Sequence, residues 1–113
     1  MSGQISWVEL PAADTARARA FYCGLFGWGT SEFGPDYHVI GGGPAGAIAP
    51  RGDGFTHPRV YFGTGDIDAS AKQVRELGGH SEDVQTIPGV GRIAHCHDDQ
   101  GTPFSLYEPA AQD

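Results

Sequence analysis

The sequence is poor in basic residues and has no long apolar run. Seven Lys and Arg residues stand against fourteen Asp and Glu residues, and the formal net charge is −7. Such a surface repels phosphate backbones and anionic membranes, so we expect neither nucleic acid nor a membrane as a partner. No apolar stretch approaches the roughly 20 residues of a membrane span, and no signal-peptide pattern is present. We therefore expect a cytoplasmic protein.

Cysteine is also scarce. Cys23 and Cys96 match no paired metal-ligand spacing, and in a reducing compartment free thiols are expected. Glycine, by contrast, is abundant, with 18 residues spread over 113 positions. This distribution indicates short turns between short strands.

A strand followed by a capped helix occurs twice in the chain. "ISWVEL" (5–10) alternates like a strand, and it precedes Asp14, a suitable N-cap, and an apolar helical face that ends at Gly27. "VYFGTG" (60–65) precedes Asp66 and a second helical face that ends at Gly79. The two caps are 52 positions apart, which indicates two copies of one module.

Each copy continues with three short strands, so each reads as a βαβββ module. The first helical face contains Ala18, Phe21, Tyr22, Leu25 and Phe26 and is expected to be buried; the second contains Ile67, Ala71, Val74 and Leu77. The further strands are expected at 28–33, 37–40, 46–49, 81–87, 92–97 and 104–107. We predict a single domain with module one at about 4–50, a linker at about 51–58 and module two at about 59–109.

Three segments carry a resemblance to a known family. "WVELPAADTARARAFYCGLFGW", "GDIDASAKQVRELGG" and "GVGRIAHCHDDQGTPFSLYEP" resemble the vicinal oxygen chelate superfamily, which includes glyoxalases, bleomycin-resistance proteins and extradiol dioxygenases. The resemblance implies an α+β fold in which two βαβββ modules form a curled sheet around a cleft, with the helices outside. It also implies homodimerisation, because members of this family often complete the cleft or a sheet edge across a two-fold axis.

The resemblance further places the metal ligands of the metal-dependent members. In this chain those places are Trp7, Val60 (or Arg59 if the register slips by one) and Ser105, with the remaining strand at 44–50. Indole, isopropyl and guanidinium groups offer no basic lone pair, and serine is a poor ligand. We therefore expect no metal cofactor at these places.

A relocated metal site is the alternative. His95 and His97 stand two apart in a predicted strand and so point to one face, with Cys96 on the other. Such a pair binds Zn²⁺, Fe²⁺, Mn²⁺ or Ni²⁺ when carboxylates converge on it. The simpler interpretation is two histidines at the solvated end of a strand, near Asp98 and Asp99.

Glu9 is the candidate catalytic or polar ligand-binding residue. It lies two positions after Trp7 and is expected to share the cleft side of the first strand. A carboxylate there suits a general base or a hydrogen-bond acceptor. The alternatives are a buried Glu satisfied by a backbone amide or Arg59, and a solvent-facing Glu.

The remaining ligand-binding candidates are chosen by alternation along the strands. Aromatic walls suit flat organic ligands, and Tyr37 lies on the face opposite His38. The full set of ligand-binding candidates is Trp7, Glu9, Tyr37, Val60, Phe62, Ser105 and Tyr107.

Two functions follow from these expectations. The first is a metal-free protein that binds a small organic molecule, in the manner of bleomycin-resistance proteins that sequester an aromatic drug or metabolite. The second is an enzyme of the same superfamily, a lyase, isomerase or dioxygenase, that uses a metal at His95 and His97 or Glu9 as general base.

Overall fold

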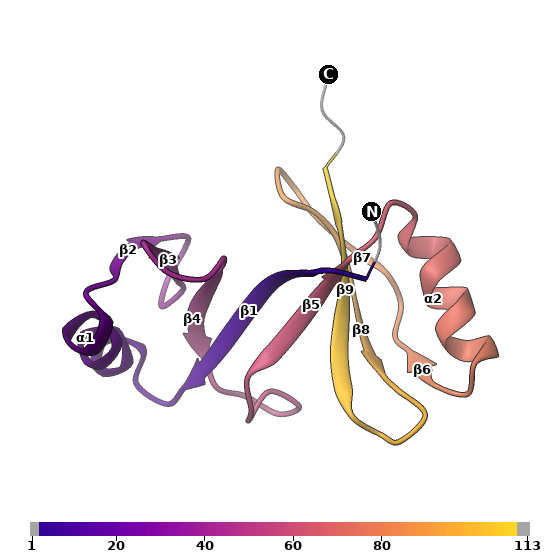
Figure 1. The fold of residues 1–113 in the computed structure, drawn as a ribbon, viewed down its shortest axis with the longest axis horizontal. Coiled ribbons are helices and arrows are strands. Elements are labelled where there is room, and N and C mark those ends of the chain that lie inside the picture. Colours follow the sequence, from indigo (N-terminus) through magenta and orange to yellow (C-terminus); the bar gives the residue numbers. More distant parts are fainter. Residues whose placement is uncertain (1–2, 111–113) are drawn as a thin grey trace. The chain divides into compact units, whose positions relative to one another are not determined.

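The computed structural model describes residues 3–110, which contain nine strands. The strand order is β2-β3-β4-β1 in the first half of the chain and β5-β9-β8-β6 in the second, where β7 also pairs with β8. Two helices complete the fold, which confirms the predicted α+β class (Figure 1). The chain divides into two compact units, one of residues 7–59 and one of residues 3–6 with 60–110. The predicted boundaries of the two modules, about 4–50 and 59–109, and of the linker between them stay predictions.

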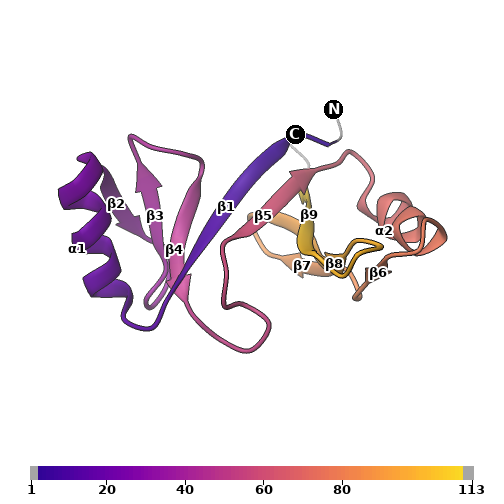
Figure 2. The same cartoon turned by 60° about the horizontal axis from the view of Figure 1, so that its bottom comes forward.

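The unit of residues 7–59 carries the first βαβββ sequence of elements. Strand β1 pairs in parallel with β4, and β4, β3 and β2 are antiparallel neighbours (Figure 2). Gly46 allows β4 to approach β1, because a Cβ at this position would overlap the carbonyl oxygen of Val8. The elements are β1 (Ile5–Ala12), α1 (Thr15–Phe26), β2 (Gly29–Glu32), β3 (His38–Gly41) and β4 (Gly46–Pro50).

Both ends of α1 are determined by the predicted capping residues. Asp14 accepts a hydrogen bond from the backbone N–H of Arg17 at 3.0 Å, which satisfies one of the free donors of the first turn. Gly27 adopts a left-handed conformation with φ of 74° and donates its N–H to the carbonyl of Cys23. Glycine adopts this conformation without a Cβ penalty, so the helix ends where the sequence predicted.

The predicted burial of the α1 face is wrong for three of its five residues. Phe21, Leu25 and Phe26 are 63%, 59% and 58% exposed. The side of α1 that is buried carries Thr15 and, half-buried, Ala18 and Tyr22, and the helix packs against β2 and β4. Apolar residues occur around much of this short helix, so periodicity alone did not separate the packed part of the predicted face from its exposed part.

The second unit repeats the βαβββ sequence of elements, but the strand that follows its helix is divided into two short strands. Strand β5 pairs in parallel with β9, and β8 is antiparallel to β9, β6 and β7. Backbone hydrogen bonds of Gly3 and Gln4 with Gly63 attach the N-terminal residues to the end of β5. The elements are β5 (Arg59–Gly63), α2 (Ile67–Glu76), β6 (His80–Ser81), β7 (Gln85–Ile87), β8 (Gly91–His97) and β9 (Pro103–Pro109).

The strand predicted at 81–87 is interrupted. His80 pairs with His97 in β6, whereas Gln85 pairs with Ile93 in β7, so the register against β8 shifts by one residue. One extra residue in residues 82–84 produces this shift, as in a β-bulge. The acidic Glu82 and Asp83 are exposed there.

Helix α2 covers one face of β8 and β9 and builds the core of this unit. Ile67 and Ala94 are fully buried, and they pack with Cys96 and Leu106. Burial raises the pKa of the Cys96 thiol, and both cysteines are free. The predicted face of α2 is buried at its start, but Leu77 is 72% exposed because it is the C-terminal cap, where the helix ends.

The start of α2 is held by charged side chains of the sheet. Asp66 caps the helix, and the backbone N–H of Ile67 donates to Glu108 Oε1 at 3.0 Å. Arg92 bridges Glu108 and Asp68, with its Nη1 2.8 Å from Asp68 Oδ2. Hydrogen bonds to Asp68 and Glu108 raise the pKa of Arg92.

None of the helices within residues 3–110 combines the length and the apolar character that crossing a bilayer requires.

Candidate functional site

A chain of hydrogen bonds joins three of the predicted site residues within residues 7–59. The indole Nε1 of Trp7 donates to the Tyr37 hydroxyl at 3.0 Å, and this hydroxyl donates to Glu9 Oε2 at 2.6 Å. All three side chains are half-buried. We refer to Trp7, Tyr37 and Glu9 as the Glu9 relay.

The sheet register explains why these residues meet. Glu9 lies opposite Ala47 of β4, and Ala47 lies opposite Val39 of β3. Side chains two positions apart share a face, so Trp7 joins Glu9 on β1, and Tyr37 reaches the same face from just before β3. The small side chain of Ala47 lies between β1 and β3 and leaves room for the Tyr37 ring to reach Glu9.

His38 lies on the opposite face, as predicted from alternation. It pairs with Ile48 and is 4% exposed. Its Nδ1 lies 4.0 Å from Glu32 Oε1, and neither ring nitrogen has a hydrogen-bond partner among residues 3–110. His38 therefore contributes to the interior of this unit and not to the Glu9 relay.

The donor and acceptor roles within the Glu9 relay follow from the chemistry of its side chains. An indole nitrogen only donates, so the Tyr37 hydroxyl accepts from Trp7 and uses its own proton for Glu9. The distance of 2.6 Å is typical of a charge-assisted bond to a carboxylate. The relay therefore orients an acidic oxygen beside an aromatic ring.

A second polar cluster lies on β8, β9 and β5 in the other unit. His95 and Ser105 face each other across β8 and β9, and His95 Nδ1 lies 2.7 Å from Ser105 Oγ. Ser105 is fully buried, and the ring of Tyr61 meets His95 edge-on at 6.3 Å. Tyr107 donates its hydroxyl proton to the carbonyl of Val90 at 3.0 Å.

The placement of Val60 and Phe62 corrects the predicted site. Tyr61 lies opposite Ser105 in the parallel pairing, so Tyr61 shares the face of Ser105 and Tyr107. Val60 and Phe62, one position away on either side, point to the other face of β5. The face of Ser105 thus includes Tyr61, which the sequence did not identify, and excludes Val60 and Phe62.

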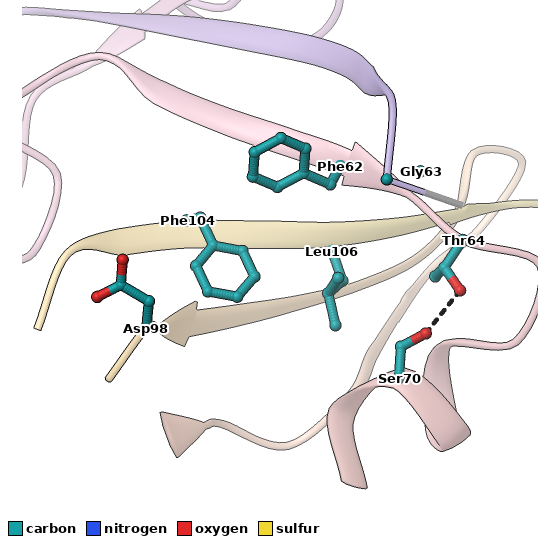
Figure 3. Close-up of a pocket in the computed structure, with 8 residues that line it drawn as sticks. Phe62, Gly63, Thr64, Ser70, Asp98, Phe104 and Leu106 are labelled. Atoms are coloured by element: carbon teal, nitrogen blue, oxygen red, sulfur yellow. Dashed lines mark hydrogen bonds between the residues drawn. The ribbon is translucent and has the colours of Figure 1, made fainter. Parts of the chain in front are cut away.

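Phe62 lines a different cavity, on the face of the sheet that α2 covers (Figure 3). The cavity has a volume of about 440 Å³, and its walls are mainly apolar. Phe62 and Phe104 meet edge-to-face with ring centres 5.8 Å apart. Thr64 and Ser70, whose hydroxyls are 2.7 Å apart, contribute polar atoms to its lining.

The donor set at the ligand places that the family resemblance implies does not fit a metal ion. Trp7 offers only an N–H, which is already bonded to Tyr37. Ser105 is a weak ligand whose oxygen is bonded to His95, and β4 presents Ala47 and Ala49 on the Glu9 face. Among residues 3–110, no group of three or more His, Cys, Asp and Glu side chains is arranged to hold a metal.

In the structure, the two histidines of the alternative metal site have different partners. His95 and His97 share a face of β8, but His95 is bonded to Ser105. His97 lies instead opposite His80 of β6. Arg59, the other residue weighed for the first strand of module two, donates to the carbonyl of Gly54 and lies over the ring of Phe55.

Comparison with known proteins finds relatives that match nearly the whole chain. No family model matches the chain. A protein named as a glyoxylase, CFP32, from Mycobacterium tuberculosis is 35% identical over 120 residues, which cover 98% of this chain and 46% of that protein. The anthracycline biosynthesis protein DauV from Streptomyces sp. strain C5 is 32% identical over 98% of this chain and 45% of its own length. The chain thus spans about half the length of these relatives.

Solved structures agree in fold. Methylmalonyl-CoA epimerase from Mycobacterium tuberculosis matches with a TM-score of 0.69 and 22% identity, over 95% of this chain and 88% of that one. A variant of homoprotocatechuate 2,3-dioxygenase from B. fuscum matches with a TM-score of 0.73 and 18% identity, over 96% of this chain and 32% of that one. These proteins share the paired-module architecture that the sequence motifs indicated. The chain belongs to the vicinal oxygen chelate superfamily.

Proposed function

We propose that this chain binds a small organic molecule at the Glu9 relay and does so without the superfamily's usual metal. The observation that carries the proposal is the hydrogen-bonded series from Trp7 through Tyr37 to Glu9. It presents one carboxylate and two aromatic side chains on one face of β1 and β3. A few fixed polar groups among aromatic walls are typical of small-molecule sites.

The chemistry of the relay favours a flat ligand with a cationic group. Trp7 and Tyr37 offer ring surface for stacking, and Glu9 offers a negative charge for an amine. The net charge of −7 adds a long-range attraction for cations. The relative DauV is named as an anthracycline biosynthesis protein. An anthracycline, which joins a planar ring system to an amino sugar, is therefore a suitable first probe, with bleomycin as a second.

Calorimetric titration of the full chain with these probes tests the proposal. Glu9→Gln removes the charge and keeps the size of the side chain, and Glu76→Gln makes the same change in charge on exposed α2. A hydrogen bond to a charged group contributes about 1.5 to 3 kcal/mol. We therefore expect Glu9→Gln to weaken binding of a cationic probe about 10- to 100-fold, and Glu76→Gln to have little effect. Equal affinities of the two variants would remove Glu9 from the site.

An enzymatic role for Glu9 is the alternative. It is favoured by one observation, the orientation of the carboxylate by Tyr37. If Glu9 is a general base, Glu9→Gln removes it and lowers the reaction rate roughly 10²- to 10⁴-fold. A binding protein shows no turnover of the bound probe, in the wild type or in the variant. Product analysis after incubation with the probe therefore separates the two functions.

We also propose a homodimer in the cytoplasm. Support for the dimer comes from the exposed apolar residues Phe21, Leu25 and Phe26 of α1, which would be desolvated by a second copy of the chain. The cytoplasmic location is supported by the acidic composition and by the two free cysteines.

A further inference from the structure

Two histidines face each other at the edge of the second unit. Strands β6 and β8 lie beside each other (Figure 1). His80 opens the two-residue strand β6, His97 ends β8, and the two residues are direct partners in the antiparallel pairing. Directly opposite residues on adjacent antiparallel strands project from the same face of the sheet. Both side chains are exposed.

The two rings lie close enough to share an ion after a small rotation of the side chains. Their centres lie 6.2 Å apart with an angle of 35° between the ring planes. An ion bound by two imidazole nitrogens, each at about 2.1 Å and at a tetrahedral angle, sets the ring centres about 5.3 Å apart. Both side chains are exposed, so rotation about their side-chain bonds closes the remaining distance.

The surroundings of the pair are acidic and structured. Asp98 Oδ1 accepts the N–H groups of Gln100 and Thr102, which holds the turn that follows His97. A Cβ placed on Gly78 would lie 3.7 Å from the Cβ of Asp99, so Asp99 lies beside the residues that lead into His80. Negative charge next to two imidazoles favours a bound cation.

We propose that His80 and His97 form a two-histidine site for a divalent transition-metal ion such as Zn²⁺, Cu²⁺ or Ni²⁺. Imidazole is a preferred ligand of these ions. No third His, Cys, Asp or Glu is placed to complete a cluster within residues 3–110. Water or a donor atom of another molecule therefore fills the remaining positions. The site differs from the predicted pair of His95 and His97 because it joins two strands and leaves His95 with Ser105.

The bound ion would connect the edge strand to the sheet. Strand β6 has only two residues and contacts α2 and β8. A metal bridge between His80 and His97 adds a cross-strand connection at the end of this strand. We therefore expect Zn²⁺ to slow amide hydrogen exchange at Ser81 and to leave exchange in the unit of residues 7–59 unchanged.

Copper titration of the untagged full chain tests the proposal. Cu²⁺ is paramagnetic, so it broadens the backbone amide resonances nearest its site. We expect broadening at residues 79–82 and 96–99, electron paramagnetic resonance coupling to two imidazole nitrogens, and displacement of Cu²⁺ by excess Zn²⁺. Broadening centred on any other segment of the wild-type chain would overturn the proposal, and this result needs no variant.

Substitutions provide the second measurement. His80→Gln and His97→Gln each remove one ligand, and His57→Gln is the matched control because His57 lies in the 51–58 loop, with Nδ1 3.1 Å from Thr56 Oγ1. We expect each site variant to weaken Cu²⁺ binding about tenfold or more, while His57→Gln binds like the wild type. Unchanged affinity in both site variants, or an equal loss in His57→Gln, would contradict the proposal.

Discussion

Tyr37 and Glu9 are joined by a hydrogen bond of 2.6 Å across 28 positions of sequence. The same hydroxyl accepts the indole proton of Trp7. A single phenolic oxygen therefore determines the orientation of both neighbours, and its removal is the most selective way to disturb the Glu9 relay.

We expect Tyr37→Phe to lower the free energy of unfolding by about 1 to 2 kcal/mol, because it leaves Trp7 and Glu9 without their shared partner. Urea unfolding followed by circular dichroism measures this loss. The control is Tyr22→Phe, which keeps the ring that stacks on Trp28 and should change stability by less than about 0.5 kcal/mol. Equal effects of the two changes would mean that the Tyr37 hydroxyl contributes nothing specific.

Gly46→Ala is expected to destabilise the protein through the strand pair that carries Glu9. The new Cβ would overlap the carbonyl oxygen of Val8, so β1 and β4 must separate. Overpacking of this kind costs about 1 to 3 kcal/mol, and binding at the Glu9 relay should weaken as well. Gly29→Ala is the control, because apart from its chain neighbours no described residue has an atom within 4 Å of a Cβ added there. Similar thermal unfolding of the two variants would argue against close strand approach at Gly46.

The two cysteines should differ in reactivity. Burial raises the pKa of Cys96, so a smaller fraction of it is thiolate at pH 8, and the thiolate is the reactive species. Cys23 is half-buried on α1. We expect a thiol reagent to modify Cys23 first and Cys96 only slowly, with Cys23→Ser used to isolate the slow phase. Fast labelling of Cys96 in folded Cys23→Ser would contradict this expectation.

The raised pKa of Cys96 also sets a pH dependence of stability. The folded state holds the thiol proton more tightly than the unfolded state does. The stabilisation is therefore complete below the ordinary pKa of a thiol and is lost as the pH rises through the folded-state value. Urea unfolding between pH 7 and pH 10 should show this loss in the wild type and a smaller one in Cys96→Ala.

The exposed face of α1 gives a prediction about assembly. We expect the wild type to be a dimer and Leu25→Ser to shift it towards the monomer, because the change removes apolar area from the proposed interface. Ala20→Ser is the control on an exposed position of the same helix. Light scattering after size-exclusion chromatography measures the mass. A monomeric wild type, or a Leu25→Ser dimer as stable as the wild type, would refute this interface.

Local signals predicted the helices because three of their four ends carry a capping residue; α2 ends at Glu76, before the predicted Gly79. Asp14, Asp66 and Gly27 occur where capping requires them, and the structure confirms all three. The pairing of Trp7 with Glu9 on one face also followed from strand alternation. Tyr37 could be placed on the opposite face from His38, but its contact with Glu9 depends on the β1–β4–β3 register, which no local pattern encodes.

Other features could be identified only from the structure. Val60, Tyr61 and Phe62 are all apolar or aromatic, so their sequence contains no polar alternation to decide which of them shares a face with Ser105. The register shift between β6 and β7 has no sequence marker, yet it is part of the arrangement in which His80 meets His97. In α1 the predicted face was too wide: Ala18 and Tyr22 are half-buried, whereas Phe21, Leu25 and Phe26 are exposed. The buried Thr15 is polar and was not part of the predicted face.

The two tryptophans provide the most direct test of ligand binding at the Glu9 relay. Trp7 belongs to the relay, and Trp28 stacks on Tyr22 and Phe26 beside α1. Their indole N–H resonances can be followed separately by nuclear magnetic resonance during titration with an anthracycline, with Trp28→Phe to assign the signals. We predict that the Trp7 resonance shifts and saturates while the Trp28 resonance stays in place. A saturating shift of Trp28 with no change at Trp7 would contradict ligand binding at the Glu9 relay.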